Sequence, residues 1–163
     1  MGMMTVIDPT YSRLGGMTNE SVDLPLKAWE ATQPDAITKD PLWTLNCYRE
    51  ALFLVDTVRN DVNEFGAPTA MTVAKEQLLT SVGSIAANIS EGYGRATAAD
   101  RSRFFSYALG STREAIAWYR TVRPTHIHPG VEDRVERLSR IRRMLLGLLG
   151  RLRANGAGKF EGW

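Results

Sequence analysis

Apolar residues recur at intervals of three and four over residues 42–63, which predicts an amphipathic helix with one buried face. The apolar stripe comprises Leu45, Tyr48, Leu52, Val55, Val58, Val62 and Phe65. Asp40 and Pro41 favour a helix start, because an aspartate can cap the first turn and a proline suits the first helical position. The glycine and proline of residues 66–68 are expected to end the helix.

A second amphipathic pattern predicts a helix over about residues 72–93. Its stripe comprises Met71, Ala74, Leu78, Val82, Ile85, Ile89 and Tyr93. Gly83 lies beside this stripe, with Ala86 and Ala87. Because glycine inside a helix costs up to about 1 kcal/mol relative to alanine, we expect a close helix neighbour there. Gly92 and Gly94 favour the end of the helix, since glycine readily adopts a left-handed turn.

The third predicted helix begins after Thr97 and runs to about Arg123, before Pro124. Thr97 and Asp100 resemble a capping box. One apolar seam with heptad spacing comprises Phe104, Ala108, Ser111, Ala115, Trp118 and Val122, and a second stripe comprises Phe105, Leu109, Ile116 and Tyr119. A helix that is apolar on two sides must bury both, so we expect contact with another subunit as well as with its own core.

A fourth helix is predicted over about residues 131–153, after a loop from Pro124 to Gly130. The residues expected to face inward are Val135, Leu138, Ile141, Leu145, Leu148 and Leu152. Arg137, Arg140 and Arg143 recur every third residue on one flank of this helix.

Four helices with short turns and no strand pattern predict an all-α fold, an antiparallel up-down-up-down four-helix bundle over residues 41–153. Residues 1–40 show no sustained period and contain several prolines and glycines, which predicts an irregular or disordered leader. The glycine-rich residues 154–163 are expected to form a flexible tail.

Composition narrows the class of protein. The chain has 163 residues, enough for one self-sufficient core, and its hydrophobic content of 44% is typical of a soluble protein. The single Cys47 excludes an internal disulfide framework and fits a reducing compartment, where a lone thiol is most often a small buried hydrophobe. No apolar run is long enough to cross a membrane and no secretory signal is present, which predicts a cytoplasmic protein.

Positive charge after residue 40 is nearly all arginine, with Lys75 and Lys159 the only lysines. Arginine binds phosphates through a planar fork, so this bias favours an anionic partner. The candidate nucleic-acid-binding residues are Arg95, Arg101, Arg103, Arg113, Arg137, Arg140 and Arg143. The alternative is an ordinary solvated helix face, since acidic side chains lie nearby in the sequence.

Residues 84–114 combine small, polar and glycine residues in a specific order. The residues of this motif are Ser84, Ile85, Asn88, Ile89, Glu91, Gly92, Gly94 and Arg95, followed by Phe105, Gly110, Ser111 and Glu114. The motif resembles that of the 23S ribosomal RNA intervening-sequence proteins, a four-helix bundle family that includes the accessory variability proteins of diversity-generating retroelements.

The resemblance implies a homopentameric barrel around a central channel. For the retroelement branch it also implies binding of RNA or DNA and contact with a reverse transcriptase. Many relatives carry an arginine pair where this chain has Leu78 to Ser81. If that pair contacts nucleic acid, this chain must supply charge elsewhere or bind weakly.

Four polar residues of the motif, Asn88, Glu91, Ser111 and Glu114, are expected to form a structural network that ties the second helix to the third. The alternative is a polar site that faces a ligand. His126 and His128 are the only histidines, and no nucleophile, base and orienting group can be assembled, so we expect no enzyme, metal or cofactor.

These observations favour a non-enzymatic, homopentameric RNA- or DNA-binding accessory protein that assists a reverse transcriptase. The alternative is an oligomeric scaffold or protein-interaction module without nucleic-acid binding. A third reading, a small-ligand sensor that uses the bundle interior, is disfavoured because the apolar stripes look filled.

Overall fold

The computed structural model describes residues 19–64, 72–122 and 130–154. Every regular element in these ranges is helical, which confirms the all-α class. The elements are α1 (Asn19–Glu30), α2 (Asp35–Thr38), the 3₁₀ helix η2 (Pro41–Thr44), α3 (Asn46–Glu64), α4 (Thr72–Tyr93), α5 (Ala98–Val122) and α6 (Val131–Ala154).

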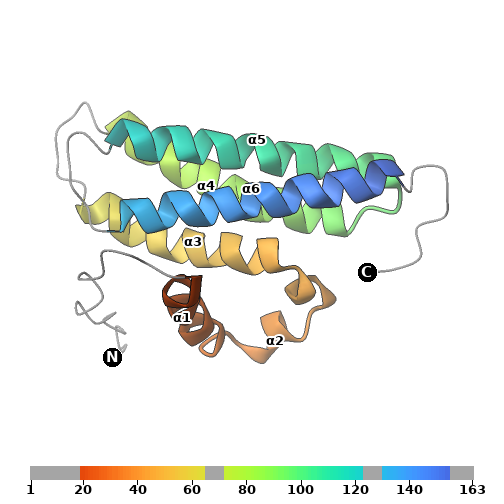
Figure 1. The fold of residues 1–163 in the computed structure, drawn as a ribbon, viewed down its shortest axis with the longest axis horizontal. Helices are drawn as coiled ribbons and strands as arrows, with labels where there is room; N and C mark the ends of the chain where they lie inside the picture. The colour runs from red at the N-terminus through yellow and green to blue at the C-terminus, as the bar shows by residue number, and fades with distance from the viewer. Residues whose placement is uncertain (1–18, 65–71, 123–129, 155–163) are drawn as a thin grey trace.

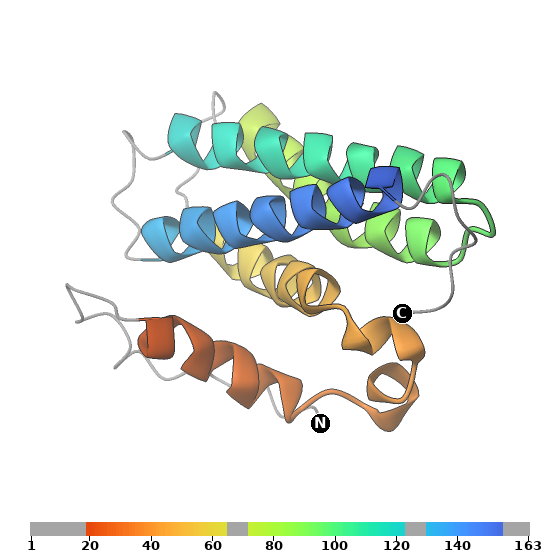
Figure 2. The ribbon, with the colours of Figure 1, turned by 45° about the vertical axis from the view of Figure 1, so that its right-hand side comes forward.

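Helices α3, α4, α5 and α6 lie side by side and form a helical bundle (Figure 1). Each of the four packs against two others, α4 between α3 and α5, and α6 between α5 and α3. One continuous hydrophobic core fills the space between them. Its fully buried aliphatic side chains include Leu54, Leu78, Val82, Ile85, Ile89, Leu138, Ile141 and Leu145. Figure 2 shows α1 and α2 outside the bundle, on the side of α3.

Helices α1 and α2 lie in the segment that we expected to be irregular. Aromatic contacts hold α1 against the bundle: the Trp29 ring stacks on Trp43 at 6.0 Å and meets Phe53 edge-on at 5.6 Å. The indole Nε1 of Trp29 also donates a 2.8 Å hydrogen bond to Asp56. The partners of Trp29 lie in η2 and α3, so the sequence of α1 alone does not identify them.

Asp40 caps a helix as expected, but the helix is the short η2. Its carboxylate accepts a 2.7 Å hydrogen bond from the backbone nitrogen of Leu42. Leu45 then adopts an extended conformation, with φ −79° and ψ 109°, and this interrupts the helical hydrogen bonds. The α-helix α3 therefore begins at Asn46 rather than at residue 42.

The buried face of α3 is rotated from the predicted stripe. The buried residues are Cys47, Glu50, Ala51, Phe53, Leu54, Thr57, Val58, Asp61 and Val62. Tyr48, Leu52 and Val55 are only partly buried. Burial raises the pKa of the Cys47 thiol to about 11, so the thiol stays neutral at physiological pH and packs as a small apolar group.

Helices α4 and α5 meet at a capped turn. The backbone nitrogen of Asp100 donates to the Thr97 hydroxyl at 3.1 Å, and that hydroxyl donates to the Asp100 carboxylate, which confirms the predicted cap. The predicted heptad seam of α5 is displaced, however. The buried residues of α5 are Phe105, Ala108, Leu109, Thr112, Ala115, Tyr119 and Val122. Phe104, Ser111 and Trp118 are half-buried, so this part of the seam lies at the edge of the core.

The close helix approach occurs at Gly92 and not at Gly83. A Cβ atom at Gly92 would lie 2.8 Å from Cε1 of Phe105, whereas a Cβ at Gly83 would meet nothing within 4 Å. The expectation of a close neighbour at Gly83 is therefore wrong within the described part of the chain. Gly92 is buried, and it allows α5 to pack closely against the end of α4.

Replacing Gly92 by alanine is expected to lower the free energy of unfolding by about 1–3 kcal/mol, because the fully buried Phe105 ring has no room to move. The matched control is Gly83→Ala, which is expected to stabilise the protein by up to about 1 kcal/mol through helix propensity. Chemical denaturation of the two variants measures both effects. Equal stability of the two variants would contradict the packing described for Gly92.

Candidate functional site

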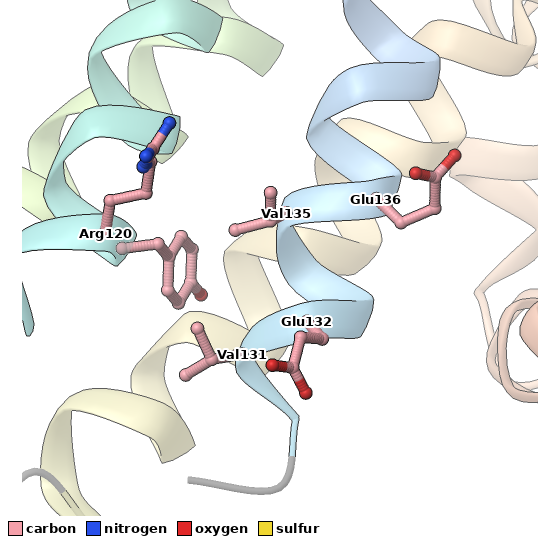
Figure 3. Close-up of a pocket in the computed structure, with 6 residues that line it drawn as sticks. Arg120, Val131, Glu132, Val135 and Glu136 are labelled. Atoms are coloured by element: carbon pink, nitrogen blue, oxygen red, sulfur yellow. The ribbon is translucent and has the colours of Figure 1, made fainter. Parts of the chain in front are cut away.

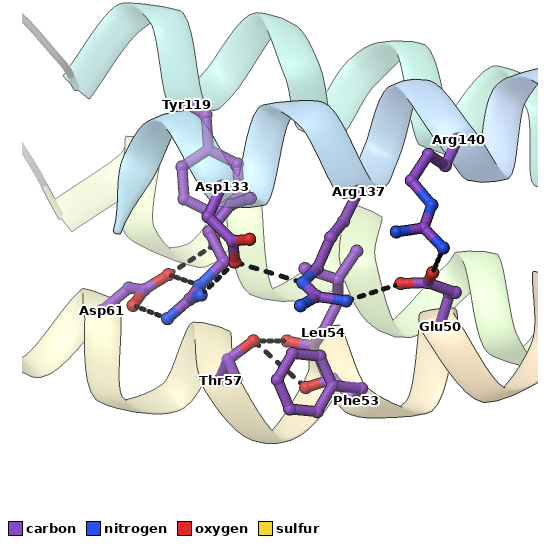
Figure 4. A network of polar contacts seen from close by, with 10 residues as sticks. Glu50, Phe53, Leu54, Thr57, Asp61, Tyr119, Asp133, Arg137 and Arg140 are labelled. Atoms are coloured by element: carbon purple, nitrogen blue, oxygen red, sulfur yellow. Dashed lines mark hydrogen bonds and ion pairs between the residues drawn. The ribbon is translucent and has the colours of Figure 1, made fainter. Parts of the chain in front are cut away.

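A network of charged side chains joins α3 to α6 inside the bundle (Figure 4). Three carboxylates and three guanidinium groups take part, so their charges balance. These residues are Glu50 and Asp61 of α3 and Asp133, Arg134, Arg137 and Arg140 of α6. Thr57 lies beside the network and donates to the backbone carbonyls of Phe53 and Leu54.

Arg137 is the centre of this network, and its side chain has 0% exposure to solvent. Its Nη1 donates to Glu50 Oε2 at 3.0 Å, and its Nε donates to Asp133 Oδ2 at 3.1 Å. The guanidinium carbon lies 4.6 Å from the centroid of the Phe53 ring. A buried charge needs such partners, because a desolvated charge left unpaired costs several kcal/mol.

Asp61 anchors the other end of the network and is almost fully buried. The Tyr119 hydroxyl donates to it at 2.7 Å, and Arg134 contacts both of its oxygens, at 3.1 and 3.3 Å. Burial, together with the negative charge of Asp61, raises the pKa of Tyr119 well above its usual value, so the phenol remains a donor. Burial alone would lower the pKa of Arg134, but Asp61 and Asp133 raise it, and this arginine stays charged.

Two of the arginines predicted to bind nucleic acid belong to this network instead. Arg137 is buried, which contradicts its predicted place on an exposed flank. Arg140 is 24% exposed, and its Nη2 lies 3.0 Å from Glu50 Oε1. The physical reason is the acidic face of α3, which holds both guanidinium groups between the helices.

The sequence carried a signal for this network that the stripe pattern missed. Glu50 and Asp61 are eleven residues apart, which is three helical turns, so they share one face. Asp133, Arg137 and Arg140 recur at spacings of four and three, which also places them on one face. An acidic face on one helix and a face rich in arginine on another are typical of two helices that pack against each other. The same pattern is equally typical of charged residues on a solvated surface.

Three of the seven candidate arginines come together at the turn between α4 and α5. Arg101 Nε donates a 2.6 Å hydrogen bond to the backbone carbonyl of Arg95. The guanidinium carbons of Arg95 and Arg103 lie 4.8 and 5.4 Å from the ring centroid of Phe104. We call Arg95, Arg101, Arg103 and Phe104 the turn cluster.

Carboxylates accompany the turn cluster. Arg95 forms an ion pair with Glu91, and Arg103 lies 3.0 Å from Asp100. The Arg95 and Arg103 side chains nevertheless remain 43% and 56% exposed. Solvent can therefore reach the guanidinium groups of Arg95 and Arg103 even though each has a carboxylate partner.

The other two candidate arginines lie apart from the turn cluster in the sequence. Arg113 is exposed on α5, ten residues beyond Arg103. Arg143 is 59% exposed on α6 and forms an ion pair with Glu136 at 3.0 Å. An exposed pair of this kind contributes little to stability, so Arg143 remains accessible to an anion.

The four polar residues of the motif do not link α4 to α5 as we expected. Asn88 donates to the backbone carbonyl of Ser84, one turn earlier in α4, and Glu91 pairs with Arg95. Glu114 accepts a long hydrogen bond of 3.4 Å from Trp118, on its own helix. Ser111 is half-buried. The close contact between the two helices comes instead from Gly92 and Phe105.

A pocket with a volume of about 280 Å³ lies between the end of α5 and the start of α6 (Figure 3). Its lining residues are Tyr119, Arg120, Val131, Glu132, Val135 and Glu136. Arg120, Glu132 and Glu136 are exposed to water, and the hydroxyl of the buried Tyr119 is already bonded to Asp61. This arrangement offers no set of buried polar groups that would orient a ligand.

Within the described ranges, no group of three or more histidine, cysteine or acidic side chains is arranged to hold a metal ion. His126 and His128 lie outside the described residues. No helix in the part of the chain that the structure describes is long and apolar enough to cross a membrane.

Comparison with known families gives one finding. A family model described as 23S rRNA-intervening sequence protein matches residues 44–147. The match runs from η2 through α3, α4 and α5 into α6, and it leaves out α1 and α2. No curated protein and no solved structure matches the chain.

Proposed function

Because this chain belongs to the 23S rRNA-intervening sequence protein family, we propose that it is a non-enzymatic, RNA-binding accessory protein that binds through the turn cluster. The observation that carries this proposal is the convergence of Arg95, Arg101 and Arg103 at one exposed turn. Guanidinium groups bind phosphate oxygens through paired hydrogen bonds, so three of them at one turn suit a nucleic-acid backbone.

A second basic element supports the same location. Arg151 and Arg153 lie in the last turn of α6 and are exposed. Figures 1 and 2 both show that this end of α6 lies at the same end of the bundle as the turn between α4 and α5. The positive charge at this end of the bundle therefore comes from two elements, the turn cluster and the last turn of α6.

We extend the proposal to assembly and partner. Each chain would form an up-down-up-down bundle, five chains would form a homopentameric barrel, and the assembly would help a reverse transcriptase engage RNA or DNA. A ring of five copies repeats the turn cluster five times. Repeated weak contacts to one nucleic acid would then raise its apparent affinity. Light scattering that gives the mass of a monomer would contradict the pentamer.

The proposed function predicts that the purified chain binds RNA with strong dependence on salt. Each phosphate neutralised by an arginine releases counterions, so log affinity should fall with log salt by roughly 0.7 for each contact to a single strand. Titration of a labelled RNA by fluorescence anisotropy at several salt concentrations measures this slope. Absence of binding at low salt, or an affinity that is indifferent to salt, would contradict the proposal.

The alternative of an oligomeric scaffold has its own support. Several large apolar side chains are exposed on the bundle, namely Val73, Leu79, Tyr107 and Leu146. Such side chains are typical of surfaces that bind another protein when they are contiguous. A chain that assembles but binds no RNA at any salt concentration would favour this alternative.

A further inference from the structure

We propose that Tyr107, together with the turn cluster, forms a stacking site for an unpaired base, so that the protein prefers single-stranded RNA to duplex RNA. This inference rests on the proposed function and adds the form of nucleic acid that the site accepts. It concerns a side chain that the arginine pattern alone does not identify.

Tyr107 carries a large aromatic ring that is exposed to solvent in the folded protein. The residue is 54% exposed, although three helical positions away Phe104 is half-buried. The two rings meet edge to face, with centroids 5.9 Å apart and an interplanar angle of 89°. This contact fixes the position of the Tyr107 ring while leaving much of its surface accessible.

The arginines beside Phe104 supply the charge that such a site needs. The guanidinium groups of Arg95 and Arg103 both lie over the Phe104 ring, within 5.4 Å of its centroid. The exposed Tyr107 ring therefore adjoins an aromatic ring that itself carries two cations through cation–π contacts. Exposed aromatic rings combined with nearby positive charge are the usual means by which proteins bind single strands.

The helix surface next to Tyr107 also has room for a flat group. Gly110 lies one turn further along α5, and a Cβ atom there would meet nothing within 4 Å. A bulky side chain at this position would lie close to one side of the Tyr107 ring, because residues three apart are neighbours on a helix. The glycine leaves that space open to a base.

Electrostatics alone would not make this region a strong site. Glu91 and Asp100 offset the positive charges of Arg95 and Arg103. The favourable energy of base stacking does not depend on salt in the way that phosphate contacts do. In a duplex the base faces are already stacked on one another, so only an unpaired base can use the Tyr107 ring.

The test compares a single-stranded oligouridylate with an RNA duplex of equal length, each titrated with the full chain by fluorescence anisotropy. Tyr107→Ala is expected to weaken binding of the single strand by about tenfold at every salt concentration and to leave duplex binding unchanged. Tyr107→Phe, which keeps the ring, should bind like the native chain. Leu146→Ala removes a comparably exposed apolar side chain from α6 and serves as the matched control.

Two results of the binding assay would overturn the inference without touching the proposed function. One is native affinity of Tyr107→Ala for the single strand, and the other is an equal loss of single-strand and duplex binding. A lower mass of Tyr107→Ala in light scattering would also overturn it, because the ring would then belong to an interface between copies. If the native chain binds neither RNA, the proposed function fails as well.

Discussion

Replacing Arg137 by methionine is expected to lower the free energy of unfolding by about 3–5 kcal/mol, the range found when one partner of a buried ion pair is removed. Methionine keeps much of the apolar volume that packs on Phe53, so the loss reports on charge rather than on a cavity. Glu50 and Asp133 would each lose one of their cationic partners. Urea denaturation of the variant and the native chain measures the difference.

The matched control for this prediction is Arg143→Met, on the same helix. The side chains of Arg143 and Glu136 are both exposed, so the loss of their ion pair should change the free energy of unfolding by less than about 1 kcal/mol. The two variants delete the same side chain and differ only in burial. A small effect of Arg137→Met, similar to that of Arg143→Met, would contradict the stabilising role of the buried Arg137 in this network.

The second large effect is expected on RNA binding. Replacing Arg95 and Arg103 together by glutamine should weaken binding of a single strand by about a hundredfold at low salt and reduce the salt slope by about 1.4. The double change removes two guanidinium groups and leaves Glu91 and Asp100 without their ion-pair partners at the turn. Arg101 is kept, because its hydrogen bond to the Arg95 carbonyl holds the turn itself.

The control for the double variant is Arg59→Gln. Arg59 is exposed on α3, five residues before the end of that helix. Figure 1 shows that this end of α3 lies at the opposite end of the bundle from the turn between α4 and α5. If binding depends only on overall charge, Arg59→Gln should weaken it by about half as much in log affinity as the double variant does. A clear loss confined to the turn variants is the expected result. Circular dichroism of each variant shows whether the helices are retained.

The helices were predictable from the sequence because apolar periodicity reports directly on burial. The stripe from Ala74 to Ile89 matches the buried face of α4, and the observed bounds of α4 are the predicted ones. The rotation of α3 was not predictable in the same way. Its buried face includes Glu50, Thr57 and Asp61. Because an argument from hydropathy places polar residues on the side that faces solvent, it could not predict this buried face.

The candidate site shows the same limitation. Arg137 and Arg143 have the same chemistry and lie on the same helix, yet the first is buried and the second is exposed. The difference arises because Glu50 of α3 faces Arg137, whereas Arg143 pairs with Glu136 on its own helix, and this depends on tertiary packing. Arg95, Arg101 and Arg103 were named only among seven candidate arginines, although they lie close together in the sequence and flank a turn marked by glycine.

The structure of α1 depends on partners that lie far along the chain. Trp29 packs on Trp43 and Phe53 and bonds to Asp56, so the helix is held by contacts that its own sequence does not show. Glu30 also forms an ion pair with Arg49 at 2.6 Å. Because the family match begins at residue 44, α1 lies outside it and covers part of α3 in this chain.

The location of RNA cross-links along the chain tests the central claim most directly. After ultraviolet irradiation of the complex and protease digestion, mass spectrometry identifies the peptides that carry nucleotide. We expect the cross-links in peptides that span residues 95–107, at the turn between α4 and α5, and their loss in the Arg95 and Arg103 double variant. Cross-links confined to α3, or a complex with none at the turn, would contradict the claim that this turn binds RNA.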